Sequence, residues 1–186
     1  MANKVKFGLS EVHIAKITYG EGGTITYGTP FALPGAVNLT LDPEGDSADF
    51  YADNTKYFSA YANNGYSGSL EIALINDTFR TQILGETQDT NGAFIENKDN
   101  TIADFALGFQ VEGDANARKF WYYNVTAQRP STGSQTIEDT KEPVTETLDI
   151  TVSARTSDGV VRAFIEPNAT NETVYNGFFE TVYPAA

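Results

Sequence analysis

Residues 144–155 read Val-Thr-Glu-Thr-Leu-Asp-Ile-Thr-Val-Ser-Ala-Arg, and they give the clearest indication of the fold class. Apolar side chains occupy every second position from Val144, apart from an interruption at Glu146, and polar side chains fill the positions between them. Successive side chains of a β-strand point to opposite faces, so this period places the apolar set on one face. The stretch therefore predicts an antiparallel strand with one buried and one solvated face.

The same alternation recurs along much of the chain. It recurs in residues 36–42, 66–74 and 101–112, where large apolar side chains alternate with polar or small ones. Glycine-rich or polar turns separate several of these segments. The sequence predicts a mainly β protein, an antiparallel β-sandwich or barrel-like fold. Further strands are expected at residues 11–19, 24–27, 48–53, 57–61, 119–129 and 160–165.

Helical signals and loops occupy the remainder. Residues 78–84 fit one short flanking helix after an N-cap at Asp77, and residues 172–182 fit a second, aromatic-rich helix within a C-terminal arm at about 170–186. An acidic, turn-rich stretch opens a long loop at about 42–64, and residues 129–143 form another polar loop. With no internal repeat and no boundary, residues 1–186 are expected to form a single domain.

The composition excludes several kinds of site. Twelve Lys and Arg stand against 25 Asp and Glu, which gives a formal net charge of −13, and there is no Cys. Without Cys there is no disulfide scaffold, zinc–thiolate site or cysteine nucleophile. A strongly acidic surface repels the phosphates of DNA. Neither the apolar region of a signal peptide nor a run of ~20 apolar residues is seen, so no membrane insertion is expected.

No catalytic or metal motif is complete. The one histidine, His13, lies in a strand pattern, where a packed or surface role is more usual than catalysis. Residues 65–69 fail the nucleophile-elbow pattern because Ser69 stands where glycine is required. Asp42, Glu44 and Asp46 have the spacing of a calcium loop, but its glycine and its final glutamate are missing. We expect no enzyme, no cofactor and no metal.

A set of short strings occurs in an order that matches one family. They are Lys6-Phe-Gly-Leu9, Thr26-Tyr-Gly-Thr-Pro30, Pro34-Gly-Ala-Val37, Leu41-Asp-Pro-Glu-Gly-Asp46, Phe50-Tyr-Ala-Asp-Asn54, Asn63-Asn-Gly-Tyr-Ser-Gly68, Leu70-Glu-Ile-Ala-Leu74, Tyr123-Asn124, Arg129-Pro130, Glu142-Pro143, Thr145-Glu-Thr147 and Thr173-Val-Tyr175. Together they resemble the major tail protein, or tail tube protein, of bacteriophages with long non-contractile tails (siphophages).

The resemblance implies a structural virion protein. Such subunits form six-membered rings that stack into a hollow tube, which encloses the tape-measure protein and later carries the genomic DNA during ejection. The implied partners are further copies of the chain, the tape-measure protein, and the tail terminator and distal tail proteins. The implied location is the phage tail of the virion, with the host cytoplasm during assembly. The family has no catalytic residues to transfer.

A conduit for DNA should carry few cations on its inner wall, because each Lys or Arg there adds a salt-dependent attraction to phosphate. Six subunits at −13 give a ring a formal charge of −78. We therefore expect the polar face of one sheet to line the lumen, the alternative being that it faces the outer solvent. The lumen-facing candidates are Asn38, Thr40, Glu71, Thr147, Asp149 and Thr151.

Assembly also needs contact surfaces, for which exposed aromatic residues are suited. Two groups of aromatic and apolar residues qualify, one in the loop at about 42–64 and one in the C-terminal arm at about 170–186. The alternative for the first group is a hairpin that packs on its own domain. The alternative for the second is a helix that closes the sandwich of its own chain. The other function left open is a monomeric β-sandwich binding module, for carbohydrate, that uses exposed Trp121 and Tyr side chains. The inter-subunit candidates are Phe50, Tyr51, Tyr57, Phe58, Tyr61, Val174, Tyr175, Phe178, Phe179 and Tyr183.

Overall fold

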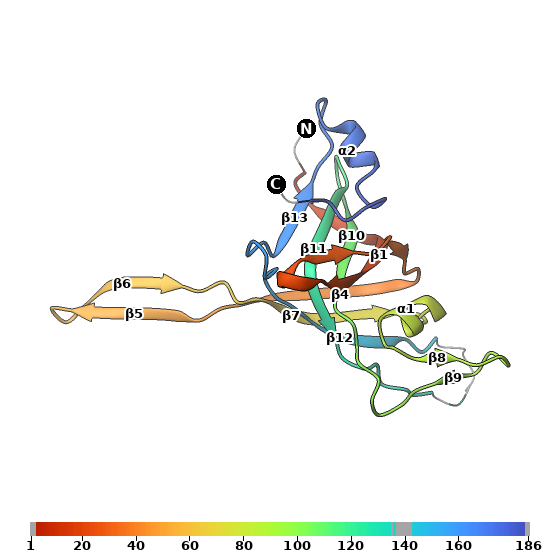
Figure 1. Ribbon diagram of the computed structural model, residues 1–186. Coiled ribbons are helices and arrows are strands. Elements are labelled where there is room, and N and C mark those ends of the chain that lie inside the picture. Colours follow the sequence, from red (N-terminus) through yellow and green to blue (C-terminus); the bar gives the residue numbers. More distant parts are fainter. Residues whose placement is uncertain (1–2, 135, 137–142, 185–186) are drawn as a thin grey trace.

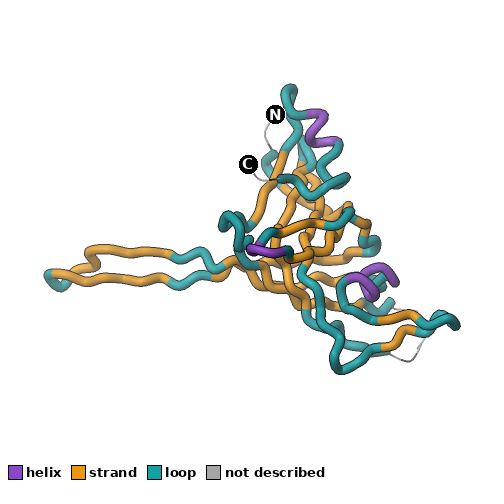
Figure 2. The backbone as a smooth tube through the Cα atoms, viewed as in Figure 1, coloured by secondary structure: helices purple, strands orange, loops and turns teal. Residues whose placement is uncertain are grey.

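The computed structural model describes residues 3–134, 136 and 143–184 (Figure 1). Strands make up most of the regular structure in this part of the chain, and the α-helices are short (Figure 2). The strands are β1 (Lys6–Tyr19), β2 (Ile25–Tyr27), β3 (Phe31–Ala32), β4 (Ala36–Glu44), β5 (Ser47–Ala52), β6 (Thr55–Tyr61), β7 (Gly65–Ile72), β8 (Thr87–Gln88), β9 (Phe94–Ile95), β10 (Phe105–Gly113), β11 (Arg118–Ala127), β12 (Glu146–Val152) and β13 (Arg162–Ile165). The helices are α1 (Asp77–Gln82), α2 (Glu172–Asn176) and the 3₁₀ turn η1 (Glu21–Gly23).

Nine of these strands form one sheet. Its order is β2-β1-β10-β11-β12-β7-β4, with β13 added to β11 and β3 added to β1. Every pairing within it is antiparallel. The prediction of a mainly β, antiparallel fold is confirmed. The described strands do not close into a barrel, because no ladder joins the end strands β2 and β4.

The sheet bends over a single main core. Register shifts in the β1–β10 and β10–β11 ladders mark β-bulges, which bend strands. As a result β1 and β4 approach each other although four strands lie between them in the sheet order. The core cluster joins side chains from both halves, such as Leu107 of β10 and Leu148 of β12, and α1 adds Phe79 to it. Figure 1 shows β1 and β10 lying over β4 and β7.

The C-terminal segment covers the outer face of β10 and β11. Phe178, Phe179 and Val182 pack there against Trp121 and Tyr123 in a second core cluster. The predicted exposure of one strand face is therefore wrong for this half of the sheet, where both faces are covered. The predicted helix over 172–182 is also too long, because α2 ends at Asn176 and Gly177 follows as its C-cap.

The ends of β12 and α1 differ from the prediction. β12 stops at Val152, so Val144 and Ala154 are exposed instead of buried, whereas Arg155 is buried. The N-cap of α1 is Asn76 and not Asp77, because the Asn76 side chain accepts a hydrogen bond from the Phe79 backbone N–H.

Of the predicted polar loop and C-terminal arm, residues 135, 137–142 and 185–186 lie outside the described residues. None of the described helices has the length and apolar character that crossing a membrane requires.

The stretch at about 42–64 is regular structure and not a loop, and the strands expected within it at 48–53 and 57–61 are confirmed as β5 and β6. β4 continues to Glu44, and β5 and β6 form a two-stranded hairpin, which we call the arm. The backbone N–H groups of Asn64 and Ala62 donate to the carbonyls of Glu44 and Asp46 at 2.9 Å each, so the arm extends the β4–β7 pair without a break in hydrogen bonding. Figure 1 shows the arm projecting far from the body of the domain.

Candidate assembly surfaces

The lumen candidates lie together on one surface of the sheet. β12 pairs with β7, and β7 with β4, so their side chains form rows across three strands. One row is Thr147, Glu71 and Asn38, and the next places Asp149 and Thr40 on either side of Ser69. We call this surface the polar face: Asn38, Thr40, Asp42, Glu44, Ser67, Ser69, Glu71, Thr147, Asp149 and Thr151.

The polar face is acidic because of the alternation along each strand. Leu70, Leu148 and Ile150 point from the same strands into the core, which leaves the intervening polar residues outside. β4, β7 and β12 contain carboxylates but no Lys or Arg. The hydroxyl of Thr145, which precedes β12, donates to Glu71 at 2.6 Å, and within the face the Ser67 hydroxyl donates to Glu44. The negative charge is therefore held by local hydrogen bonds, without cationic partners on these strands.

The acidic surface continues beside β11 through Asp104, a residue that the alternation of the sequence does not place there. Thr126 pairs with Thr151, and its hydroxyl donates to Asp104 at 2.7 Å. The hydroxyl of Tyr19 donates to the other oxygen of Asp104 at 2.6 Å. Burial and this hydrogen bond raise the pKa of Tyr19 to about 12, so Tyr19 is a neutral donor at physiological pH. Asp104 thus adds a further carboxylate beside the polar face.

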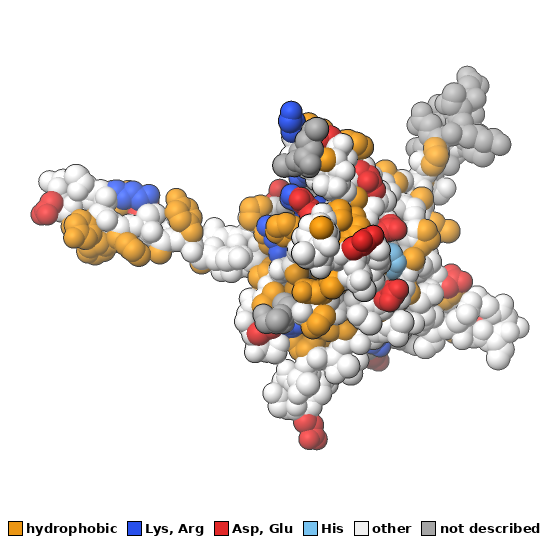
Figure 3. Space-filling view, turned by 90° about the horizontal axis from the view of Figure 1, so that it is seen from above, with side chains coloured by type: hydrophobic (Ala, Val, Ile, Leu, Met, Phe, Trp, Pro, Cys, Tyr) orange, Lys and Arg blue, Asp and Glu red, His pale blue; other side chains and the backbone are white. Residues whose placement is uncertain are grey.

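The arm exposes the first group of contact candidates. Phe50 pairs with Phe58 across the hairpin, and both rings are about three-fifths exposed, at 60% and 61%. Tyr51, Tyr57 and Tyr61 are more exposed still, up to 79% for Tyr61. Figure 3 shows hydrophobic side chains gathered along the arm. These residues do not pack on their own domain as the alternative interpretation required.

The two faces of the arm differ in polarity. Ala48, Phe50, Phe58 and Ala60 are cross-strand partners and make one face apolar. The other face carries Asp49, which accepts from Ser59 at 2.7 Å and pairs with Lys56 at 2.8 Å. These two hydrogen bonds lower the pKa of Asp49. Asp53 and Asn54 form the tip with φ of 51° and 59°, a left-handed conformation that both residue types tolerate in hairpin turns.

The structure divides the C-terminal candidates. Val174 and Tyr183 are exposed, and Tyr175 is half-buried with its hydroxyl donating to the Ala117 carbonyl at 3.1 Å. Phe178 and Phe179 are buried in the second core cluster of their own chain. We therefore no longer propose these two rings as inter-subunit contacts, in line with the alternative that the terminal segment closes its own domain.

Trp121 does not offer a sugar-stacking platform. Its side chain is fully buried, with an exposed fraction of 0%, and its indole N–H donates to the Phe178 carbonyl at 2.8 Å. The carbohydrate-binding alternative required an exposed Trp121, and that requirement is not met.

The structure combines an exposed acidic face, an arm with exposed aromatic side chains and a core covered by the C-terminal segment of the same chain. This combination is typical of a structural subunit that associates with other copies. A family model described as phage tail tube protein matches residues 2–177. The chain therefore belongs to the phage tail tube protein family, a family of structural proteins and not of enzymes. Membership implies self-assembly and a place in the tail of a phage virion. No curated protein matches the chain.

Proposed function

We propose that this chain polymerises as stacked hexameric rings into a phage tail tube whose lumen is lined by the polar face. The observation that carries the proposal is the clustering of Asp42, Glu44, Glu71 and Asp149 on three adjacent strands that contain no Lys or Arg. The tube would enclose the tape-measure protein, end against the tail terminator and distal tail proteins, and conduct genomic DNA without specific binding. Assembly would proceed in the host cytoplasm.

An acidic wall suits passage better than a neutral or basic one. Duplex DNA carries one negative charge per ~1.7 Å of its axis, so it is repelled from carboxylates and held by cations. Salt screens this repulsion beyond ~8 Å at physiological ionic strength, so only a wall close to the duplex contributes. The repulsion would centre the DNA and leave few contacts to break as it moves.

The arm would supply contacts between subunits. A two-stranded hairpin with an exposed apolar face is marginally stable alone in water, and Phe50 and Phe58 lie uncovered in the single chain. Aromatic side chains are enriched at the centres of protein interfaces. The projecting arm is therefore a suitable contact between neighbouring copies, with exposed Val174 and Tyr183 as lesser candidates.

Electron microscopy and sedimentation of the purified chain over a range of concentrations test this proposal. We expect rings or tubes with six-fold symmetry above a critical concentration. The matched control is Thr170→Ala, an exposed polar change outside the arm and the polar face, which should assemble like the unmodified chain. Dispersed monomers under all conditions would contradict the proposal and favour the monomeric binding module.

A further inference from the structure

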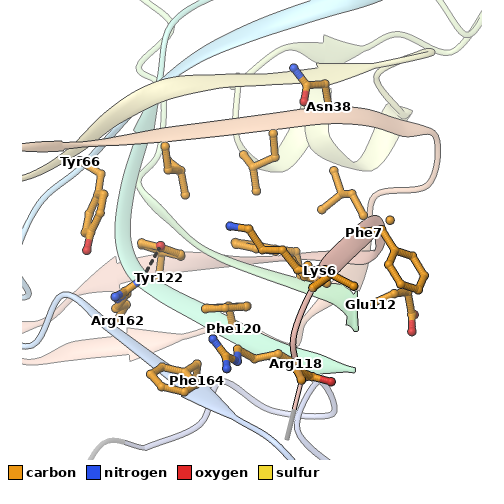
Figure 4. A pocket seen from close by; sticks show the side chains of 18 of the residues that line it. Lys6, Phe7, Asn38, Tyr66, Glu112, Arg118, Phe120, Tyr122, Arg162 and Phe164 are labelled. Atoms are coloured by element: carbon orange, nitrogen blue, oxygen red, sulfur yellow. Dashed lines mark hydrogen bonds between the residues drawn. The ribbon is translucent and has the colours of Figure 1, made fainter. Parts of the chain in front are cut away.

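An open groove lies on the side of β4 that faces the core, and Asn38 is the one residue of the polar face that borders it. It is bounded by the start of β1, by β4 and by the neighbouring ends of β11 and β13, and its volume is about 860 Å³ (Figure 4). Figure 4 shows Phe7, Phe120 and Phe164 around this space, with Lys6, Arg118 and Arg162 beside them. The groove is the mouth of the bent sheet, where β1 and β4 do not join by a ladder.

The floor of the groove is aromatic. The ring of Phe109 stacks on Phe120 at a centroid distance of 5.0 Å and on Tyr122 at 5.8 Å. At the rim, Phe7, Val37 and Phe164 are each more than half exposed. Large apolar side chains that remain exposed side by side mark a binding surface, because a folded chain otherwise covers them.

The rim is also unusually basic for an acidic protein. Among the described residues, four Lys and Arg side chains have no carboxylate oxygen within 4.0 Å, namely Lys4, Lys6, Lys16 and Arg162. Three of the four, all except Lys16, line the groove, and Glu112 is the carboxylate in the lining that has no Lys or Arg partner within 4.0 Å among the described residues. Arg162 instead donates to the hydroxyl of Tyr122 at 3.3 Å and lies over the ring of Tyr66. The groove therefore presents three cationic side chains that have no carboxylate partner among the described residues.

We propose that this groove receives the arm of a second copy of the chain. The inference rests on the proposed self-assembly and names the acceptor that the arm requires. The apolar face of the arm, with Phe50 and Phe58 at its centre, would lie on the aromatic floor. Asp53 at the tip, which has no ion-pair partner among the described residues, would face the unpaired cations of the rim.

The position of the groove, and not its charge, favours the arm over DNA as its occupant. The groove cations lie on the core-facing side of β4, opposite the polar face, so the proposed path of the DNA does not reach them. The arm and the groove are different patches of one molecule, which makes the contact heterologous. Such a contact gives a closed ring when its rotation closes and an open helical filament when it does not.

Two lysines of β1 provide a matched test of the groove. Lys6 and Lys16 are both exposed and unpaired among the described residues, but only Lys6 lines the groove. Lys6→Glu should raise the critical concentration for tube formation about tenfold, because it places a carboxylate opposite Asp53. Lys16→Glu makes the same charge change outside the groove and should alter that concentration less than about twofold. Thermal melting of both monomers checks that each variant folds.

Cross-linking locates the arm directly, because the chain contains no Cys. Val37→Cys places a thiol at the exposed rim, and Ala60→Cys places one on the apolar face of the arm. A short bis-maleimide applied to assembled tubes of the double variant should give a ladder of covalent multimers. Each single variant should give at most covalent dimers.

The outcomes separate this inference from the proposed function. Multimer ladders together with a selective effect of Lys6→Glu support the groove as the acceptor. Tubes that form normally but show equal effects of the two lysine changes and no ladder overturn the inference, while the proposed function stands. An unmodified chain that never assembles refutes both.

Discussion

Asp149→Lys is the change that best distinguishes a polar face that lines the lumen from one that faces outward. Asp149 lies on β12 in the middle of the polar face and is exposed. Its carboxylate makes no hydrogen bond or ion pair with the described residues, whereas that of Glu71 accepts from Thr145. The change should therefore alter the free energy of unfolding by no more than about 0.5 kcal/mol.

The size of the effect on DNA follows from the number of contacts. Each substitution adds two charges, so a six-membered ring changes from −78 to −66 and stays strongly negative. Direct phosphate contacts must then dominate any effect. Six lysines per ring that each contact a phosphate give a salt slope of about −5, which is roughly a 10³-fold stronger attraction at 50 mM than at 200 mM salt.

The assay is the rate of DNA ejection from particles whose tubes carry Asp149→Lys, measured at both salt concentrations. We expect slow ejection at 50 mM and recovery toward the normal rate at 200 mM. Glu180→Lys is the matched control, since it makes the same charge change at an exposed position of the C-terminal segment. Ejection at the normal rate at both salt concentrations would refute the lumen assignment.

Three further predictions concern the core, the arm and a buried tyrosine. Phe178→Ala should lower the free energy of unfolding by about 3–5 kcal/mol in urea denaturation, because the ring is buried in the second core cluster beside Phe179 and Tyr183, and a loss below 1 kcal/mol would contradict that packing. Replacing Phe50 and Phe58 together by Ser should leave monomer stability within about 0.5 kcal/mol but abolish sedimentable polymer, and normal polymerisation would remove the arm as a contact. Burial raises the pKa of Tyr123 to about 12 from an unfolded value of 10.0, so this contribution to stability is complete below pH 10 and is lost as the pH rises toward 12. Tyr123→Phe should flatten that part of the stability profile, and an unchanged profile would show that Tyr123 is not its source.

Local patterns in the sequence located most of the strands but not all of their ends. Period-two alternation reports which face of a strand is apolar, and it placed Leu148 and Ile150 correctly in the core. The pattern does not report where the partner strand stops. Val144 and Ala154 continue the alternation of residues 144–155, yet both lie beyond β12 and are exposed.

The C-terminal segment shows the limit of helical periodicity. Val174, Phe178 and Val182 recur at helical spacing, but Gly177 lies among them and α2 ends before it. Phe178 is buried because Trp121, 57 positions away in the chain, provides both the apolar surface and an N–H donor. A contact between residues so far apart in sequence cannot be read from local spacing.

The candidate assembly surfaces were predictable to different degrees. The six lumen candidates came together because alternation and antiparallel pairing place them on one face, although which direction that face takes in a tube stays a prediction. Within the expected loop the sequence predicts strands at 48–53 and 57–61, which match β5 and β6, but a bulge between Phe50 and Tyr51 interrupts the alternation, so one continuous hairpin is not evident from the pattern. The Asp53-Asn54 pair is a turn signal that could have identified the hairpin. The groove joins Lys6 to Arg162 across the fold, and nothing in the sequence places them together.

A cryo-electron microscopy reconstruction of the assembled polymer is the most direct test of the central claim. We expect six-membered rings in which β4, β7 and β12 present Asp149 and its acidic neighbours to the bore. A reconstruction in which that surface faces the outer solvent, or in which Lys and Arg line the bore, would contradict it.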